Sequence, residues 1–254
     1  AELGRSFPIS VGLQSDVRAG LQKMLDASSE VGSPGDEKQR ATWVARTQQL
    51  VGDWKASVDH LWNSNDMPMR TERLSKELSD HMPSDAILLS DTGHSGIWTG
   101  TMIDFTSPDQ SFIRCAGSLG WAFPAALGAK CATPDRPVVC FTGDGGFWYH
   151  MPELETALRR GINTVTVINN NHSLNQGKRG ADRAYEGVDG NAGDLYEFVD
   201  VDFAKIARTV GCFGVRVTEP GQIRGALDAA LASGKPAVVD VVSDIEGIAA
   251  KAWG

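Results

Sequence analysis

The sequence predicts an α/β fold in which a doubly wound, parallel, six-stranded sheet carries helices on both faces. Between residues 66 and 254, short apolar runs alternate with segments of helical periodicity. The apolar runs are continuous rather than alternating, as expected for parallel strands that are buried on both faces. Two of the runs end in the oxygen-bearing side chains of Asp144 and Asn171. Ligands bind where the carboxyl ends of such strands meet, so a site is expected there.

The apolar runs and the helical patterns alternate along the whole of this segment. Strands are expected near residues 86–90, 111–115, 137–142, 163–169, 212–217 and 237–243. Helices are expected at residues 70–82, 95–103, 121–132, 151–160, 202–210 and 221–233. At about 190 residues, the segment is long enough to bury a core of its own.

The first 65 residues have a different pattern. A short helix is expected to end near Leu25, and a stretch rich in serine, glycine and proline follows at residues 28–35. Residues 37–62 then show apolar side chains at helical spacing, which predicts one amphipathic helix whose tryptophans serve in packing.

The spacing of Asp144 and Asn171 is the most informative feature of the chain. Asp144 lies in a Gly-Asp-Gly-Gly turn after one apolar run, and Asn171 closes the next run 27 residues later. In a βαβ unit, the loops after two parallel strands lie side by side, so the carboxylate and the amide oxygen are brought together. Hard oxygen donors beside a glycine-rich turn suit Mg²⁺ that holds a phosphate group.

This Gly-Asp-Gly and Asn-Asn pair resembles the signature of thiamine-diphosphate (ThDP) enzymes, of the acetohydroxyacid synthase and 2-oxoacid decarboxylase family. The resemblance implies ThDP and Mg²⁺ as cofactors and leaves FAD open. It implies that Asp144 and Asn171 bind the metal through side-chain oxygens and Ser173 through its backbone carbonyl. It also implies a lyase or carboligase that acts on 2-oxo acids or 2-hydroxyacyl substrates, as acetolactate synthase does.

Other segments resemble the same family and imply further site residues. Leu119 falls where the family has an apolar residue wedged beneath the cofactor, which would hold the two cofactor rings in a V shape. His94 and Gln176 are the remaining candidates for catalytic residues. The expected cofactor-binding residues are Thr92, Gly93, His94, Ser95, Gly117, Ser118, Leu119, Gly143, Asp144, Gly145, Gly146, Asn171, Ser173, Leu174 and Asn175.

The largest departure from the family follows Asn171. Acetohydroxyacid synthases place a Met and then a Trp here, and this chain has neither. A polar, glycine-rich stretch stands at residues 177–197 instead, and it suits either a substrate lid or a solvated surface loop. This departure leaves the specific reaction open, but it does not change the expected cofactor.

Members of this family are normally more than twice as long as this chain. The part of those proteins that has no counterpart here carries the pyrimidine-binding domain with an essential glutamate. No position in this chain matches that glutamate. The resemblance assigns residues 1–30 to the tail of a central domain, 31–65 to a linker and helix, and 66–254 to the diphosphate- and Mg²⁺-binding domain. The expected partner is a second polypeptide or an N-terminal segment that carries the missing domain, in a homo- or hetero-oligomer of at least two units.

Composition narrows the class of protein. A net charge of −8 and an isoelectric point near 5.1 argue against nucleic acid as a partner. No apolar stretch approaches the roughly 20 residues of a membrane span, and no signal peptide opens the chain, so we expect a cytoplasmic enzyme. The four cysteines form no C-x-x-C pair, which argues against zinc or iron–sulfur ligation.

Three alternatives stay open at this point. One is the β-subunit of a 2-oxoacid:ferredoxin oxidoreductase, which would usually bring cluster-binding cysteines. Another is a non-catalytic, regulatory ThDP-binding protein. A dinucleotide-binding Rossmann domain is the third, although no G-x-G-x-x-G sequence follows a strand.

Overall fold

The computed structural model describes residues 2–31 and 37–249 and divides the chain into two compact units, Ala1–Ser57 and Val58–Gly254. The first unit contains helix α1 (Val17–Val31) and most of helix α2 (Glu37–Trp62). Helix α1 continues six residues past the expected end near Leu25 and buries none of its residues. Trp43 on α2 is 72% exposed, contrary to the packing role expected for it, whereas Trp62 is buried.

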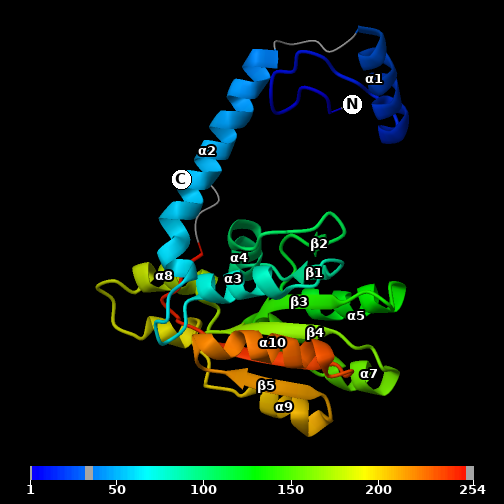
Figure 1. Ribbon diagram of the computed structural model, residues 1–254. Helices are drawn as coiled ribbons and strands as arrows, with labels where there is room; N and C mark the ends of the chain where they lie inside the picture. The colour runs from blue at the N-terminus through cyan, green and yellow to red at the C-terminus, as the bar shows by residue number, and fades with distance from the viewer. Residues whose placement is uncertain (1, 32–36, 250–254) are drawn as a thin grey trace. The chain divides into compact units, whose positions relative to one another are not determined.

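The second unit is built on one six-stranded sheet, and the predicted fold class is confirmed (Figure 1). All pairings are parallel, in the order β2-β1-β3-β4-β6-β5. The strands are β1 (Ile87–Ser90), β2 (Ser111–Arg114), β3 (Val138–Gly143), β4 (Val165–Asn170), β5 (Phe213–Val217) and β6 (Ala237–Val242). The four inner strands are buried almost throughout, which explains their continuous apolar runs, whereas the edge strand β2 is largely exposed and the edge strand β5 is mostly half-buried.

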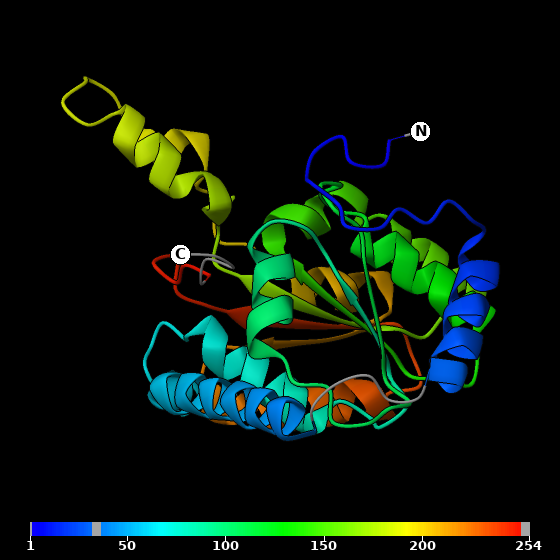
Figure 2. The ribbon, with the colours of Figure 1, turned by 90° about the horizontal axis from the view of Figure 1, so that it is seen from above.

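Helices cover both faces of this sheet (Figures 1 and 2). One face packs against α5 (Ala122–Ala132), α6 (Asp144–His150), α7 (Glu153–Arg160) and α9 (Phe203–Val210). The other packs against α3 (Thr71–His81), α4 (His94–Met102) and α10 (Ile223–Ala232), which follows the short 3₁₀ helix η2 (Pro220–Gln222). The apolar core on the first face contains a row of three rings, in which Phe147 lies 5.1 Å from Phe123 and 5.6 Å from Phe203 between ring centroids.

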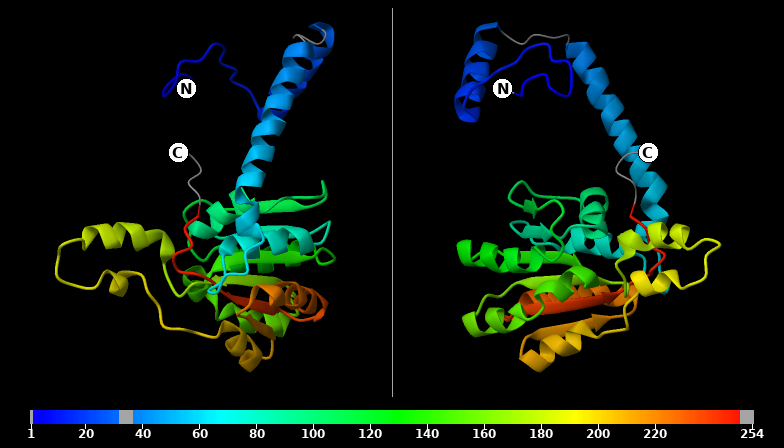
Figure 3. Two further views of the ribbon diagram at one scale, coloured as in Figure 1. Left: turned by 60° about the vertical axis from the view of Figure 1, so that its left-hand side comes forward. Right: turned by 180° about the vertical axis from the view of Figure 1, so that it is seen from behind.

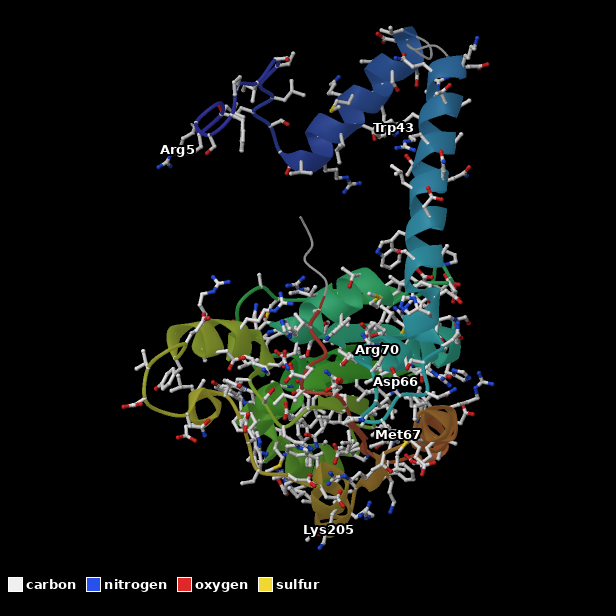
Figure 4. The ribbon with its side chains drawn as sticks, turned by 90° about the vertical axis from the view of Figure 1, so that its left-hand side faces the viewer. Arg5, Trp43, Asp66, Met67, Arg70 and Lys205 are labelled. Atoms are coloured by element: carbon white, nitrogen blue, oxygen red, sulfur yellow. The ribbon has the colours of Figure 1, made fainter. Side chains whose placement is uncertain are left out.

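A local sequence signal explains where α9 begins. Asp202 caps α9, because its Oδ1 accepts a hydrogen bond from the backbone N–H of Lys205 at 2.7 Å. Lys205 itself lies on the outer side of α9, at the end of the unit away from Asp66, Met67 and Arg70 (Figure 4).

Two helices occupy segments that the sequence did not predict to be helical. The Gly-Asp-Gly-Gly turn is the first turn of α6, and residues 177–197, expected as a loop, contain most of α8 (Asn175–Ala184) and the 3₁₀ helix η1 (Ala192–Leu195). The α8–η1 segment projects beyond the carboxyl edge of the sheet in both views of Figure 3. Among the residues that the structure describes, no helix is long and apolar enough to cross a membrane.

Strand order creates the crevice in which the site lies. The chain leaves β1 toward β2 on one side and leaves β3 toward β4 on the other, so the loops after β1 and β3 diverge. A crevice at such a switch point, at the carboxyl ends of the strands, is where ligands bind in open α/β sheets.

Candidate active site

A cavity of about 510 Å³ opens at the carboxyl ends of β1, β3 and β4. It brings together most of the predicted site residues, from loops that are far apart in the sequence. Those that line it are Thr92, Gly93, His94, Ser95, Leu119, Gly143, Asp144, Gly145, Gly146, Asn171, Ser173, Leu174, Asn175 and Gln176. Gly117 and Ser118 do not line the cavity; they are exposed and belong to the loop that carries Leu119.

Ser173 connects the other two predicted metal-binding residues, Asp144 and Asn171. Asp144 is 2% exposed, and its Oδ2 accepts a hydrogen bond from the backbone N–H of Ser173 at 2.9 Å. The Ser173 hydroxyl lies 3.3 Å from Oδ1 of Asn171, to which it donates. The register of β3 against β4 pairs Gly143 with Asn169, so both loops start at the same level of the sheet. Parallel pairing therefore brings the carboxylate and the amide oxygen together.

Burial changes the chemistry of Asp144. Loss of hydration raises the pKa of its carboxyl group to about 7, although the backbone N–H groups of Gly145 and Ser173 partly oppose this, and nearby Asp240 adds to it. An ionised carboxylate in this position lacks the water that would normally solvate it. A bound cation would supply the missing stabilisation.

Packing accounts for the glycines around Asp144. A Cβ on Gly145 would lie 2.6 Å from Cδ2 of Leu174, and a Cβ on Gly146 would lie 2.7 Å from Oγ1 of Thr142. A side chain at either position would require these neighbouring side chains to shift. The glycines thus let α6 begin close to the rest of the cavity wall.

His172 stands between two of the predicted metal ligands but faces away from the cavity. It has φ +55°, in the left-handed region that is uncommon for residues other than glycine. Its carbonyl accepts a hydrogen bond from the N–H of Phe198 at 2.6 Å, and its Nε2 lies 3.7 Å from Oδ1 of Asp200. Asp200 in turn pairs with Arg216 at 2.5 Å. This turn directs Asn171 and Ser173 toward the cavity and leaves the imidazole outside it.

His94 begins α4 and lines the cavity. Burial lowers the pKa of its imidazole and the charge of Arg179 contributes in the same direction, whereas the side chain of Asn175 opposes them. The lowered pKa favours the neutral ring near pH 7. Its Nδ1 is buried and forms no hydrogen bond by distance and angle within the part of the chain that the structure describes.

Helix α8 forms one wall of the cavity and is fastened at both ends. Lys178 donates to Asp182 at 2.9 Å within the helix and pairs with Glu246 at 3.2 Å. The hydroxyl of Tyr196 donates to Asp182 at 2.8 Å, and the Asn175 side-chain amide donates to the carbonyl of Ile245. These long-range partners stabilise a helix whose two internal glycines give it low intrinsic propensity.

Several residues that line the cavity were not predicted from the sequence. They are Asn169, Gly177, Gly180, Ala181, Leu195 and Tyr196. Asn169 is the penultimate residue of β4 and is 5% exposed, and its Oδ1 accepts a hydrogen bond from the hydroxyl of Thr71 at 3.1 Å. Its neighbour Asn170 points to the opposite face and donates to Asp240 at 2.8 Å. Successive side chains of a strand point to opposite faces, so Asn169 shares a face with Asn171 and Asn170 does not. This alternation could have identified Asn169 from the predicted role of Asn171.

The residues that the structure describes contain no group of three or more His, Cys, Asp or Glu side chains arranged to bind a metal ion.

Comparison with known proteins agrees with this geometry. The family described as "Thiamine pyrophosphate enzyme, C-terminal TPP binding domain" matches residues 91–241, and thiamine pyrophosphate is another name for ThDP. The chain is 27% identical to the acetolactate synthase large subunit of Haemophilus influenzae, over 95% of this chain and 41% of that protein. It is 29% identical to the glyoxylate carboligase of Escherichia coli O157:H7, over 95% of this chain and 42% of the relative.

A probable acetolactate synthase of Mycobacterium bovis is 31% identical over 93% of this chain and 41% of its own length. The chain thus spans about two fifths of the length of these relatives. The family match begins at Asp91 after β1 and ends within β6, so it contains the three strand ends that form the cavity. Since this match covers more than half of the sequence, the chain belongs to the thiamine-diphosphate enzymes and contains their C-terminal cofactor-binding domain.

Proposed function

We propose that this chain binds the diphosphate and Mg²⁺ of ThDP for a lyase or carboligase that acts on 2-oxo acids or 2-hydroxyacyl substrates. One observation carries the proposal: the buried carboxylate of Asp144 and the amide oxygen of Asn171 meet through Ser173 at the wall of a 510 Å³ cavity. The family membership supports the cofactor, and the names of the relatives support C–C bond chemistry.

The donor set fits Mg²⁺. Asp144 would supply a carboxylate oxygen, Asn171 its side-chain oxygen and Ser173 its backbone carbonyl, with diphosphate oxygens and water in the other positions. The raised pKa of Asp144 supports this assignment, because a cation offsets the desolvation that raises it. The first turns of α4 and α6 also open onto the cavity, and their free N–H groups favour a bound anion.

We assign the remaining lining residues by their place in the cavity. Leu119 supplies an apolar surface for the cofactor rings. His94 and Gln176 both line the cavity, and Oε1 of Gln176 lies 3.3 Å from the position that a Cβ on Gly93 would occupy. When bound, ThDP would supply the carbon centre at which C–C bonds next to a carbonyl are made or broken. The chain would bind and orient it, with His94 and Gln176 as the candidates for contact with the substrate.

The other half of the site is proposed to come from a second polypeptide or from an N-terminal segment that carries a pyrimidine-binding domain. No glutamate lines the cavity among the described residues. Glu155 is exposed on α7 and pairs with Arg159 at 2.7 Å, outside the cavity. Denaturing mass spectrometry of the protein purified from its source would detect a second polypeptide or a longer chain.

Calorimetric titration with ThDP in the presence of Mg²⁺ tests the proposal. The wild-type chain should bind, and Asp144→Ala should abolish Mg²⁺-dependent binding, because the carboxylate is the only charged ligand assigned to the metal. Glu155→Ala is the matched control, since Glu155 is an exposed carboxylate of the same face of the sheet, and it should bind as wild type does. Tight Mg²⁺-dependent binding by Asp144→Ala would contradict the assignment.

A further inference from the structure

The carboxylate of Asp91 connects three loops around the cavity, although it does not line the cavity itself. Asp91 is 1% exposed and follows β1. Its Oδ1 accepts hydrogen bonds from the backbone N–H groups of Thr92 at 2.7 Å and Gly120 at 3.0 Å. Its Oδ2 accepts one from the hydroxyl of Thr142 at 3.0 Å, directly before the turn that contains Asp144.

Thr92 makes a second connection to the same loop. Its Oγ1 accepts a hydrogen bond from the backbone N–H of Gly117 at 3.1 Å. The two hydrogen bonds from Gly117 and Gly120 therefore bracket Leu119. Both glycines adopt the left-handed backbone region, with φ +85° and +87°, so the chain turns at each end of this short segment.

Within the described part of the chain, few other hydrogen bonds fix residues 116–119. Residues 116–118 are exposed, and Leu119 is half-buried. The other hydrogen bonds of this loop are internal, from the Cys115 thiol and the Trp121 N–H to the carbonyl of Ser118 at 3.9 Å and 3.3 Å. The hydrogen bonds to Asp91 and Thr92 therefore connect the segment to the loop that follows β1.

The Asp91 carboxylate is also closely packed against the first turn of α6. A Cβ on Gly146 would lie 2.8 Å from Oδ2 of Asp91, and a Cβ on Gly120 would lie 3.0 Å from the carbonyl oxygen of Gly146. The carboxylate therefore fills the space between the first turn of α6 and the segment that carries Leu119. A shift of either one would have to move Asp91.

We infer that Asp91 and Thr92 are positioning residues that form a clamp, which sets the place of Leu119 relative to Asp144. The inference rests on the proposed function, in which Leu119 contacts the cofactor rings and Asp144 binds the metal. The buried carboxylate of Asp91 then links the loop that supports the cofactor rings to the turn that supports the diphosphate. In this role both residues act through Leu119.

Amide hydrogen exchange measured by NMR on the free chain tests the clamp without any cofactor. Thr92→Val removes the acceptor for the Gly117 N–H at nearly constant shape, and we expect that amide to exchange about tenfold faster or more. Thr92→Ser keeps the hydroxyl and should retain the protection. Asp91→Ala should expose the Gly120 amide in the same way. Unchanged exchange of Gly117 in Thr92→Val would overturn the clamp.

Binding in the presence of Mg²⁺ separates positioning from a general structural role. Thr92→Val should weaken ThDP binding by roughly two- to fivefold, because Leu119 is no longer held in place against the cofactor rings. In a Leu119→Ala background, Thr92→Val should then have no further effect on ThDP binding. A full additional loss in that background would overturn the inference, because it would show that Thr92 acts independently of Leu119. Failure of the wild-type chain to bind ThDP would contradict the proposed function, while the exchange experiment would still decide the clamp.

Discussion

Asp144 and Asn171 show how much chemistry a sequence can reveal at the scale of single residues. Their place was predictable because each follows a buried run, and parallel strands bring such ends together. Asn169 was not singled out, and the hydrogen-bond partners of Asp91 were not predicted. The partners of Asp91 lie 29 and 51 residues further along the chain, at Gly120 and Thr142, and no local pattern marks them. Long-range hydrogen bonds of this kind are visible only in the folded chain.

Leu119 gives a prediction at this scale. Replacing it with alanine removes an apolar surface beneath the proposed position of the cofactor rings but touches neither the metal ligands nor the diphosphate loop. Leu119→Ala should therefore leave ThDP binding mostly intact and lower kcat by on the order of 10–100-fold, since misplaced reacting groups are costly. Calorimetry on this chain and turnover of a 2-oxo acid by the complete enzyme would measure the two effects. A large loss of affinity with unchanged kcat would contradict the assigned role.

Among the secondary-structure elements, the six strands were predictable to within one or two residues, since apolar continuity is a strong signal. Helices α6 and α8 were missed, and glycine is the reason in both. Gly145 and Gly146 disfavour a helix, yet Phe147 anchors α6 between Phe123 and Phe203. Helix α8 depends on Lys178 and its partner Glu246, which lies far away in sequence. In both cases tertiary contacts outweigh local propensity.

Helix α9 and strand β5 approach each other so closely at Gly214 that a side chain cannot be accommodated. A Cβ on Gly214 would lie 2.2 Å from the carbonyl oxygen of Ala204, which is backbone and cannot rotate away. We expect Gly214→Ala to lower the free energy of unfolding by roughly 1–3 kcal/mol, as overpacking does. Urea denaturation would measure the change.

Gly225 in α10 provides the matched control. A Cβ there would meet no atom within 4 Å, so only the backbone contribution of glycine remains. Gly225→Ala should raise the free energy of unfolding by about 0.5–1 kcal/mol, because alanine favours the helix. Equal effects of the two substitutions would show that the α9–β5 contact is not tight.

The second unit contains buried carboxyl groups whose ionised form destabilises the folded state. Asp240 lies in β6 between the Asn170 amide at 2.8 Å and the Phe203 N–H at 3.0 Å. Burial raises its pKa to about 6, despite these hydrogen bonds and the charge of Arg216. The pKa values of Asp91 and Asp144 are raised for the same reason. Each of these groups binds protons more tightly in the folded chain than in the unfolded one.

The sign of the resulting pH dependence follows from linkage. The stability contributed by a protonated Asp240 is fully present below about pH 4 and is lost as the pH rises through about 6. We therefore expect Asp240→Asn to remove part of the decrease in unfolding free energy between these pH values, on the order of 3 kcal/mol. Urea denaturation of both proteins at pH 4.5 and pH 7 would measure the difference. Parallel pH profiles for the two would contradict the prediction.

The two ends of the sheet domain lie side by side. Met69, just before α3, forms a parallel bridge with Ser243, just after β6, and the carbonyl of Met69 accepts a hydrogen bond from Asp244 at 2.8 Å. Because entry and exit meet, neighbouring polypeptide can be attached or exchanged without stretching the sheet. A recombination event at this junction would therefore transfer all the strand ends that form the cavity together.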